Sequence, residues 1–205
     1  MNVEILISFT LAVFALAISP GPDNIFVLVQ SIRFGKKPAL AVVAGLMTGC
    51  LIHTSLVAFG VSLLIVKNET LFTILKIFGA CYLLFLAYKV FKSSDAIKLN
   101  DENLEAKSHS KLFRQGFIMN VLNPKVSLFF LALFPGFLFN ENLSETLQFF
   151  ILGGIFILAS FVVFGSIALL AGSLKKYIEK HPHSGRFLKW LQIFVFIGIA
   201  LFILI

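Results

Sequence analysis

Ser19-Pro20-Gly21-Pro22-Asp23-Asn24 interrupts an apolar run near the start of the chain, and Asn120-Val121-Leu122-Asn123-Pro124-Lys125 interrupts a second run about half a chain later. Proline has no backbone N–H and disfavours helix at the residue before it, so each stretch should break the helix that its surroundings would form. Each stretch also contains an ionisable residue, Asp23 in the first and Lys125 in the second. The sequence therefore predicts two broken helices, each with a charge at the break.

The apolar sequence around these breaks is typical of a membrane protein. Of the 205 residues, 59% are hydrophobic and 13% are charged, and the mean hydropathy is +0.97. A soluble chain of this length would need more polar residues to cover its surface. Because a bilayer admits helices of about 20 apolar residues, we predict an all-α membrane protein with six transmembrane helices. These are expected at residues 5–32, 39–66, 71–91, 112–139, 147–170 and 187–205.

Lys and Arg are distributed unevenly among the connections between these spans. Fourteen of the 17 would lie on one side: Arg33, Lys36, Lys37, Lys89, Lys92, Lys98, Lys107, Lys111, Arg114, Lys175, Lys176, Lys180, Arg186 and Lys189. Cytoplasmic loops retain positive charge during insertion, so this side should be cytoplasmic and both termini non-cytoplasmic. The net charge of +7 then comes from basic loops that act as an insertion signal near the anionic lipid headgroups of the bilayer. We expect no nucleic-acid partner.

The polar stretch at 93–111 should be a cytoplasmic linker between two halves, a first three-helix repeat at 1–92 and a second at 112–205. Pro20 and Pro124 are 104 positions apart, and glycines repeat at nearly the same offset, Gly49 with Gly154 and Gly60 with Gly165. Three spans per half would give the halves opposite orientations. Interrupted spans at matching positions of inverted repeats indicate a transporter whose substrate binds where the breaks meet.

The residues at the breaks predict the chemistry of that substrate. Asn123 and Pro124 are typical of a helix N-cap and first turn, so the positive end of the following helix, together with Lys125, should attract a carboxylate. Asp23 begins the other half-helix and could receive an ammonium group or a proton. The alternative is that Asp23 and Lys125 only pair with each other. The expected substrate-binding residues are Pro20, Gly21, Pro22, Asp23, Asn24, Asn120, Asn123, Pro124 and Lys125.

The second span contains Gly45 and Gly49, whose spacing favours close packing of another helix. His53 in the same span is, with Asp23, a candidate for relaying protons. It could equally be a packing residue whose ring is held by a hydrogen bond. Cys50 and Cys81 lie in apolar runs and predict neither a disulfide nor a metal site. No cofactor is expected.

The chain resembles the lysine exporter (LysE/RhtB) family of bacterial amino-acid efflux proteins over essentially its whole length. The motifs are Ser19-Pro20-Gly21-Pro22, Gly45-Leu46-Met47-Thr48-Gly49, Gly79-Ala80-Cys81-Tyr82-Leu83, Gly116-Phe117 and Asn123-Pro124-Lys125, followed by Phe129-Phe130 and Pro135. Gly136 follows Pro135 where family members often have Gln, which bears on substrate identity. The resemblance implies export of amino acids across the bacterial inner membrane, driven by the proton-motive force.

Two other functions compete with amino-acid export. Efflux of a divalent metal ion would require several carboxylates, imidazoles or thiolates converging within the spans, and the spans offer few. An intramembrane serine protease would need a histidine near an activated serine, and Ser127 lies in no Gly-x-Ser-x-Gly turn. We therefore expect no enzymatic activity. The sequence leaves the oligomeric state open, and a homo-oligomer is compatible with it.

Overall fold

The computed structural model describes residues 2–61, 69–94, 106–181 and 183–204, and the regular structure in this part of the chain is entirely helical. The helices are α1 (Val3–Ile18), α2 (Pro22–Phe34), α3 (Lys36–Leu56) with the π-helix η1 (Val57–Val61), α5 (Glu69–Lys92), α6 (His109–Val121), α7 (Pro124–Leu128) with the π-helix η2 (Phe129–Leu133) and the 3₁₀-helix η3 (Phe134–Phe137), α8 (Glu145–Lys180) and α9 (Ser184–Leu204). The all-α prediction is confirmed.

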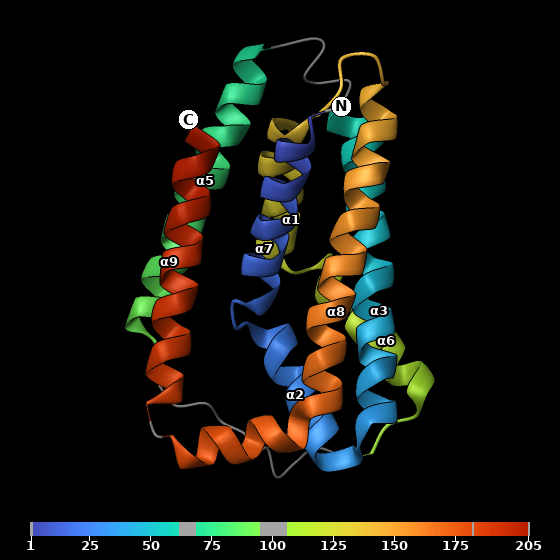
Figure 1. Cartoon of the computed structure of the whole chain (residues 1–205), viewed down its shortest axis with the longest axis vertical. Coiled ribbons are helices and arrows are strands. Elements are labelled where there is room, and N and C mark those ends of the chain that lie inside the picture. The colour runs from blue at the N-terminus through green and yellow to red at the C-terminus, as the bar shows by residue number, and fades with distance from the viewer. Residues whose placement is uncertain (1, 62–68, 95–105, 182, 205) are drawn as a thin grey trace.

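The two broken helices run in opposite directions through the molecule (Figure 1). The first pair, α1 and α2, starts at the end of the molecule where both termini lie and bends by 59° at the break. The second pair, α6 and α7 with its continuation, starts at the opposite end and bends by 47°. The predicted breaks in the first and fourth spans are therefore present.

Five of the six predicted spans meet length and composition criteria for crossing a membrane within the described residues. Three are single helices, α3 with η1, α8 and α9, and two are the bent pairs. The 24-residue α5 coincides with the predicted third span, so a count of six stays a prediction. Residues 62–66 at the end of the second predicted span, Lys67, Lys98 and residues 95–105 of the predicted linker lie outside the described residues.

Two features of the helices were not predicted. The helix α8 continues ten residues beyond the predicted end of its span at Leu170, because residues 171–180 become polar without containing a proline. After the second break, the helix changes to π and then 3₁₀ geometry. Pro135 has no N–H to donate to Leu131, which disfavours regular α-helix there.

Glycines allow α3 and α6 to pack in direct backbone contact. A Cβ added to Gly45 would lie 2.0 Å from the carbonyl oxygen of Phe113, and one added to Gly116 would lie 2.3 Å from that of Val42. A Cβ on Gly49 would lie 2.7 Å from Oδ1 of Asn120. The predicted packing role of Gly45 and Gly49 is confirmed, and it holds the second break against α3.

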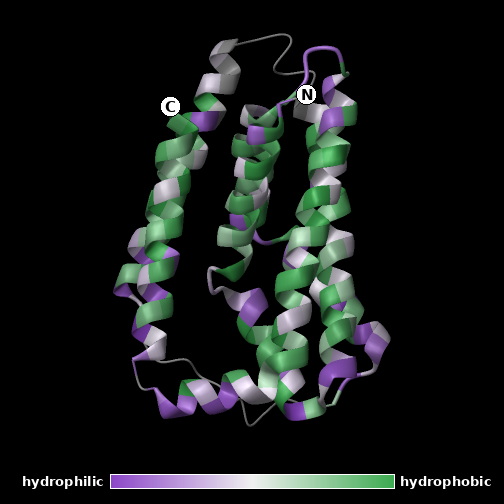
Figure 2. Ribbon diagram, viewed as in Figure 1, coloured by the Kyte–Doolittle hydropathy of each residue, from purple (hydrophilic) through white to green (hydrophobic). Residues whose placement is uncertain are grey.

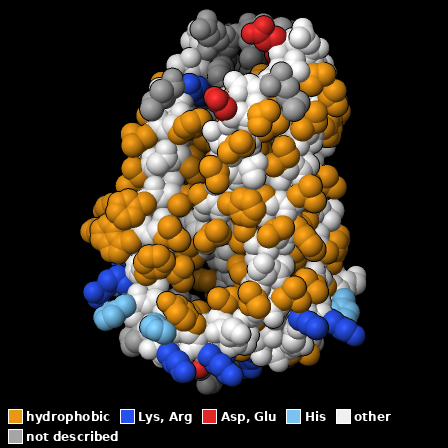
Figure 3. Space-filling view, viewed as in Figure 1, with side chains coloured by type: hydrophobic (Ala, Val, Ile, Leu, Met, Phe, Trp, Pro, Cys, Tyr) orange, Lys and Arg blue, Asp and Glu red, His pale blue; other side chains and the backbone are white. Residues whose placement is uncertain are grey.

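The surface divides into an apolar belt and two polar ends. Hydrophobic side chains cover the middle of the molecule, and hydrophilic ones gather at the ends and near the first break (Figures 2 and 3). Most of the visible Lys and Arg lie at the end opposite the termini (Figure 3). We call this the basic end; it includes the turn between α2 and α3 and the junction of α8 with α9, with Arg33, Lys36, Lys37, Lys175, Lys180 and Arg186.

Candidate functional site

The first break exposes carbonyl groups that side chains then satisfy. Gly21 is the N-cap of α2 in extended conformation, and Pro22 is the first helical residue. The carbonyl oxygen of Ala17 accepts a 2.7 Å hydrogen bond from Nδ2 of Asn24. That of Ser19 accepts a 2.8 Å bond from Nζ of Lys125, which comes from the second break. Lys125 therefore connects the two breaks. It does so through a carbonyl group of the unwound stretch between α1 and α2, which proline interrupts.

The second break is capped as predicted. Asn123 is the N-cap of α7, and its Oδ1 accepts a 3.0 Å hydrogen bond from the backbone N–H of Lys125. Pro124 frees the carbonyl of Asn120, which accepts the N–H of Asn123 at 3.0 Å and lies 3.2 Å from Nε2 of His53. Both polar ends of Asn123 are used, because its Nδ2 donates to Oδ2 of Asp23 at 2.6 Å.

Asp23 and Lys125 line one small buried pocket without forming an ion pair. Asp23 is 6% exposed and is held by Asn123, while Lys125 is held by Ser19 and lies 5.9 Å from the ring centroid of Phe196. The ion pair within 4.0 Å found among the described residues joins Lys175 and Glu179 on the surface. The alternative that Asp23 and Lys125 only neutralise each other therefore has no direct contact to support it.

The expected site residues divide between two cavities. A polar pocket of about 20 Å³ is lined by residues of both breaks, among them Gly21, Asp23, Asn24, Asn120, Asn123 and Lys125. Pro20 and Pro22 line a much larger cavity on the other side of the first break, together with Gly21 and Asn24. Pro124 and Leu122 are exposed on the outer face of the molecule. Pro124, one of the expected substrate-binding residues, thus lines neither cavity. The side chains of Pro124 and Leu122 carry no polar group that lipid would leave unsatisfied.

Besides the expected site residues, the polar pocket and its surroundings contain residues that sequence reasoning missed. Ser19 contacts Lys125 of the pocket but does not line the pocket itself. Ser19 is fully buried, and its Oγ has no hydrogen-bond partner although its carbonyl binds Lys125. Its position directly before Pro20 was a usable signal, because the residue before proline leaves helical geometry. Cys50 and Ser160 line the pocket from α3 and α8. Neither follows a break, so only the packing of the helices brings them there.

His53 is buried and contacts an aromatic ring and a carbonyl oxygen. It is 5% exposed, and its ring lies 5.4 Å from that of Phe130. Its Nε2 faces the Asn120 carbonyl that also accepts the N–H of Asn123. A carbonyl oxygen accepts hydrogen bonds and cannot pass a proton onward. Within the part of the chain that the structure describes, no direct hydrogen bond joins His53 to Asp23.

The described residues include no group of three or more His, Cys, Asp or Glu side chains that could hold a metal ion. Cys50 is buried, Cys81 is exposed on the apolar belt, and both are free thiols. The polar groups of the pocket are thus one carboxylate, one ammonium group, the side-chain amides of three asparagines, the Cys50 thiol and the Ser160 hydroxyl.

Two broken helices with opposite charges at their breaks indicate a membrane transporter. Comparison with known proteins leads to the same class of protein. The family model described as LysE type translocator matches residues 14–205. The chain belongs to the LysE-type translocator family. The resemblance noted from the motifs is thereby confirmed.

Curated relatives cover most of the chain. A protein of Salmonella typhimurium named homoserine/homoserine lactone efflux protein is 34% identical over 179 residues, which is 87% of this chain and 86% of that protein. The Bacillus subtilis membrane protein YrhP is 31% identical over 173 residues, 80% of this chain and 81% of its own. No solved structure matches the chain. As a LysE-type translocator the chain is a multi-pass membrane transporter of the efflux class and not an enzyme.

Proposed function

We propose that this translocator is a secondary active exporter of amino acids or similar small zwitterions across the bacterial inner membrane, coupled to proton entry. The observation that carries the proposal is the meeting of Asp23 and Lys125 in one buried pocket, each held by neutral groups. An ionisable residue within a membrane is costly and is a functional hypothesis by default. The efflux activity in the name of the Salmonella relative is consistent with a substrate of this kind.

The two charges match the two ends of a zwitterion. A substrate carboxylate would replace the Ser19 carbonyl as partner of Lys125, and the Asn123 side chain would then orient Asp23 toward the substrate ammonium group. Both charges are already desolvated and held by hydrogen bonds, so binding requires little reorganisation. A substrate with only one charge would leave the other charge of the site unpaired.

Proton coupling follows from competition at Asp23. Its carboxylate binds either the substrate ammonium group or a proton, and these two occupants exclude each other. If the empty carrier returns with Asp23 protonated, each outward substrate movement is exchanged for inward proton movement. Such exclusive occupancy is the simplest way for one buried carboxylate to couple two fluxes.

The packing around the site favours loading from the basic end. The larger cavity reaches from Pro20 to Ser94 and Lys189 at the basic end. On the other side of the breaks, Phe9, Phe129, Phe130, Phe134 and Phe156 form a buried aromatic cluster. We propose that the structure is the inward-facing state and that the basic end is cytoplasmic.

Six spans in two inverted repeats complete the proposal. The two broken pairs run in opposite directions, and each is followed by two long helices, α3 and α5 or α8 and α9. Both termini lie at the same end of the molecule (Figure 1), which requires an even number of crossings. Adding α5 to the five candidate spans gives that even number.

Feeding dipeptides to cells with and without the protein tests export. Expression should raise at least one free amino acid in the medium, and Asp23→Asn or Lys125→Met should reduce that increase to the level of cells without the protein. Lys175→Met is the matched control, because it removes a lysine from an exposed surface ion pair. Identical amino-acid pools with and without the protein, for every dipeptide, would contradict the proposal.

A charge swap tests direct recognition. Asp23→Lys combined with Lys125→Asp keeps both charges in the pocket but removes the hydrogen bonds of each to its neighbours. We expect the double variant to be inactive although it inserts normally. Restoration of full export would show that the two residues act as a mutual pair and not as separate contacts to substrate.

A further inference from the structure

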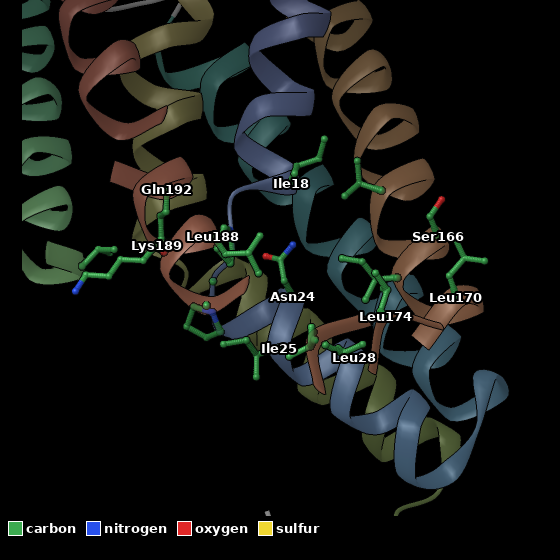
Figure 4. A pocket seen from close by; sticks show the side chains of 18 of the residues that line it. Ile18, Asn24, Ile25, Leu28, Ser166, Leu170, Leu174, Leu188, Lys189 and Gln192 are labelled. Atoms are coloured by element: carbon green, nitrogen blue, oxygen red, sulfur yellow. The ribbon is translucent and has the colours of Figure 1, made fainter. Parts of the chain in front are cut away.

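A chamber of about 680 Å³ lies beside the polar pocket, between α1, α2, α8 and α9. Its walls are mostly apolar, with Ile18, Ile25, Leu28, Ile167, Leu170 and Leu188 among the lining side chains (Figure 4). This volume is typical of cavities that bind small molecules. The chamber is therefore large enough for a ligand, and its chemistry is that of an apolar one.

The polar pocket cannot hold an amino acid by itself. Its 20 Å³ leaves room for about one water molecule. Gly21 and Asn24 line both the pocket and the chamber. Figure 4 shows Asn24 of α2 and Leu188 of α9 among the side chains that line the chamber. A substrate whose charged end reaches Asp23 and Lys125 must therefore place the rest of its body in the chamber.

The part of the chamber nearest the basic end is lined by polar residues, Ser93, Ser94, Lys189 and Gln192. Lys189 donates a 2.7 Å hydrogen bond from Nζ to the carbonyl of Ser93, which joins α9 to the end of α5 there. Gln192 lines the chamber one turn further along α9. Polar groups in the wall favour a ligand that carries polar groups of its own over a lipid chain that enters from the bilayer.

We propose that the chamber is a side-chain subsite and that this translocator selects zwitterions with an apolar side chain. The inference rests on the proposed function, since the charged end is taken to bind Asp23 and Lys125. Each methylene buried against the apolar wall favours binding about fourfold. A hydroxyl in the same place loses its hydrogen bonds to water and meets a mostly apolar wall. Leu188 is a specificity-determining residue because it lines the chamber from the helix facing Asn24.

Norvaline and homoserine test the selectivity, because they differ only in a terminal methyl group in place of a hydroxyl group. In proteoliposomes containing the wild-type protein, we expect norvaline to be transported at least fivefold faster than homoserine at equal subsaturating concentration. Transport of homoserine without norvaline would overturn the subsite and leave the proposed function standing. Transport of no amino acid at all would count against the proposed function itself.

Variants of Leu188 test the location. Leu188→Trp should reduce norvaline and homoserine transport at least tenfold, because both side chains have nearly the same size and must occupy the chamber, and Leu188→Ala should make phenylalanine a better substrate than it is for the wild type. Phe187→Trp and Phe187→Ala are the matched controls, because Phe187 is the adjacent residue and is 69% exposed on the outer face. Norvaline transport by Leu188→Trp equal to that of the wild type would overturn the inference. A loss of copurifying phospholipid in Leu188→Trp with unchanged transport would also overturn it, because a lipid chain would then be the occupant.

Discussion

Asn123 supports both breaks at once: its Oδ1 caps α7 and its Nδ2 donates to the carboxylate of Asp23. Replacing it by alanine removes a cap, which costs about 1 kcal/mol, and a hydrogen bond to a charged group, which costs about 2 kcal/mol. We expect Asn123→Ala to lower the free energy of unfolding by about 3 kcal/mol and the rate of export at least tenfold. Thermal unfolding of the purified protein and transport in proteoliposomes measure the two effects.

Asn123→Asp separates capping from the contact to Asp23. Aspartate caps a helix about as well as asparagine, so α7 should still form. It cannot donate to Asp23, and it places a second carboxylate against the first. Export should therefore fall further than in Asn123→Ala although the cap is kept. Export equal to the wild type in Asn123→Asp would show that the bond between Asn123 and Asp23 has no role in transport.

The site could be predicted from sequence as far as local rules reach. Asn123 followed by Pro124 predicted the cap, and the prolines predicted which stretches unwind. Ser160 lies far from either break in the sequence, and nothing local marks it as a pocket residue. The hydrogen-bond partners of Asp23 and Lys125 could not be predicted from local rules either. Whether each charge bonds to the opposite charge or to a nearer carbonyl or amide group depends on how the helices pack.

At the scale of the elements, the contact between α3 and α6 depends on glycine. Gly45→Ala would place a methyl group 2.0 Å from the carbonyl oxygen of Phe113, so one helix must move. Overpacking of this kind costs about 1–3 kcal/mol. We expect a lower thermal unfolding temperature and, because Asn120 of α6 lines the polar pocket, reduced export.

Gly154→Ala in α8 is the control for this effect. A Cβ at Gly154 would meet no atom within 4 Å, so stability should be unchanged or slightly higher. A decrease in unfolding temperature for Gly154→Ala as large as that for Gly45→Ala would show that the loss is a general response to alanine in these helices. Gly49 and Gly154 occupy matching positions in the two halves of the sequence, yet Gly49 packs against Asn120 and Gly154 has no neighbour within 4 Å. The sequence offset therefore did not predict which glycine is closely packed.

The helices themselves were largely predictable, because long apolar runs leave few alternatives in a bilayer. The end of α8 was placed at Leu170, where hydropathy falls, but a helix ends where its backbone hydrogen bonds end. No proline precedes Pro182 in that segment, so the helix continues to Lys180. Hydropathy thus locates the part of a helix that lies in lipid, and capping and proline locate its ends.

At the scale of the whole molecule, the distribution of charge predicts the orientation of the chain. The basic end carries the α2–α3 turn and the α8–α9 junction, while both termini lie at the opposite end (Figures 1 and 3). Because positively charged connections stay in the cytoplasm, a reporter enzyme that folds only outside the cytoplasm should be active when fused after Leu204. The same reporter fused after Ser94, at the basic end of α5, should be inactive.

A third reporter, at the N-terminus, decides whether α5 crosses the membrane. If α5 is a span, the chain crosses six times, three of them before Ser94, and both termini lie on the side opposite Ser94. If α5 lies outside the bilayer, five crossings remain, and a reporter after Leu204 cannot share a side with the N-terminus. A reporter fused before Asn2 fixes that side independently. Activity at both termini with none at Ser94 requires an even number of crossings, an odd number of them before Ser94, and therefore α5 in the membrane.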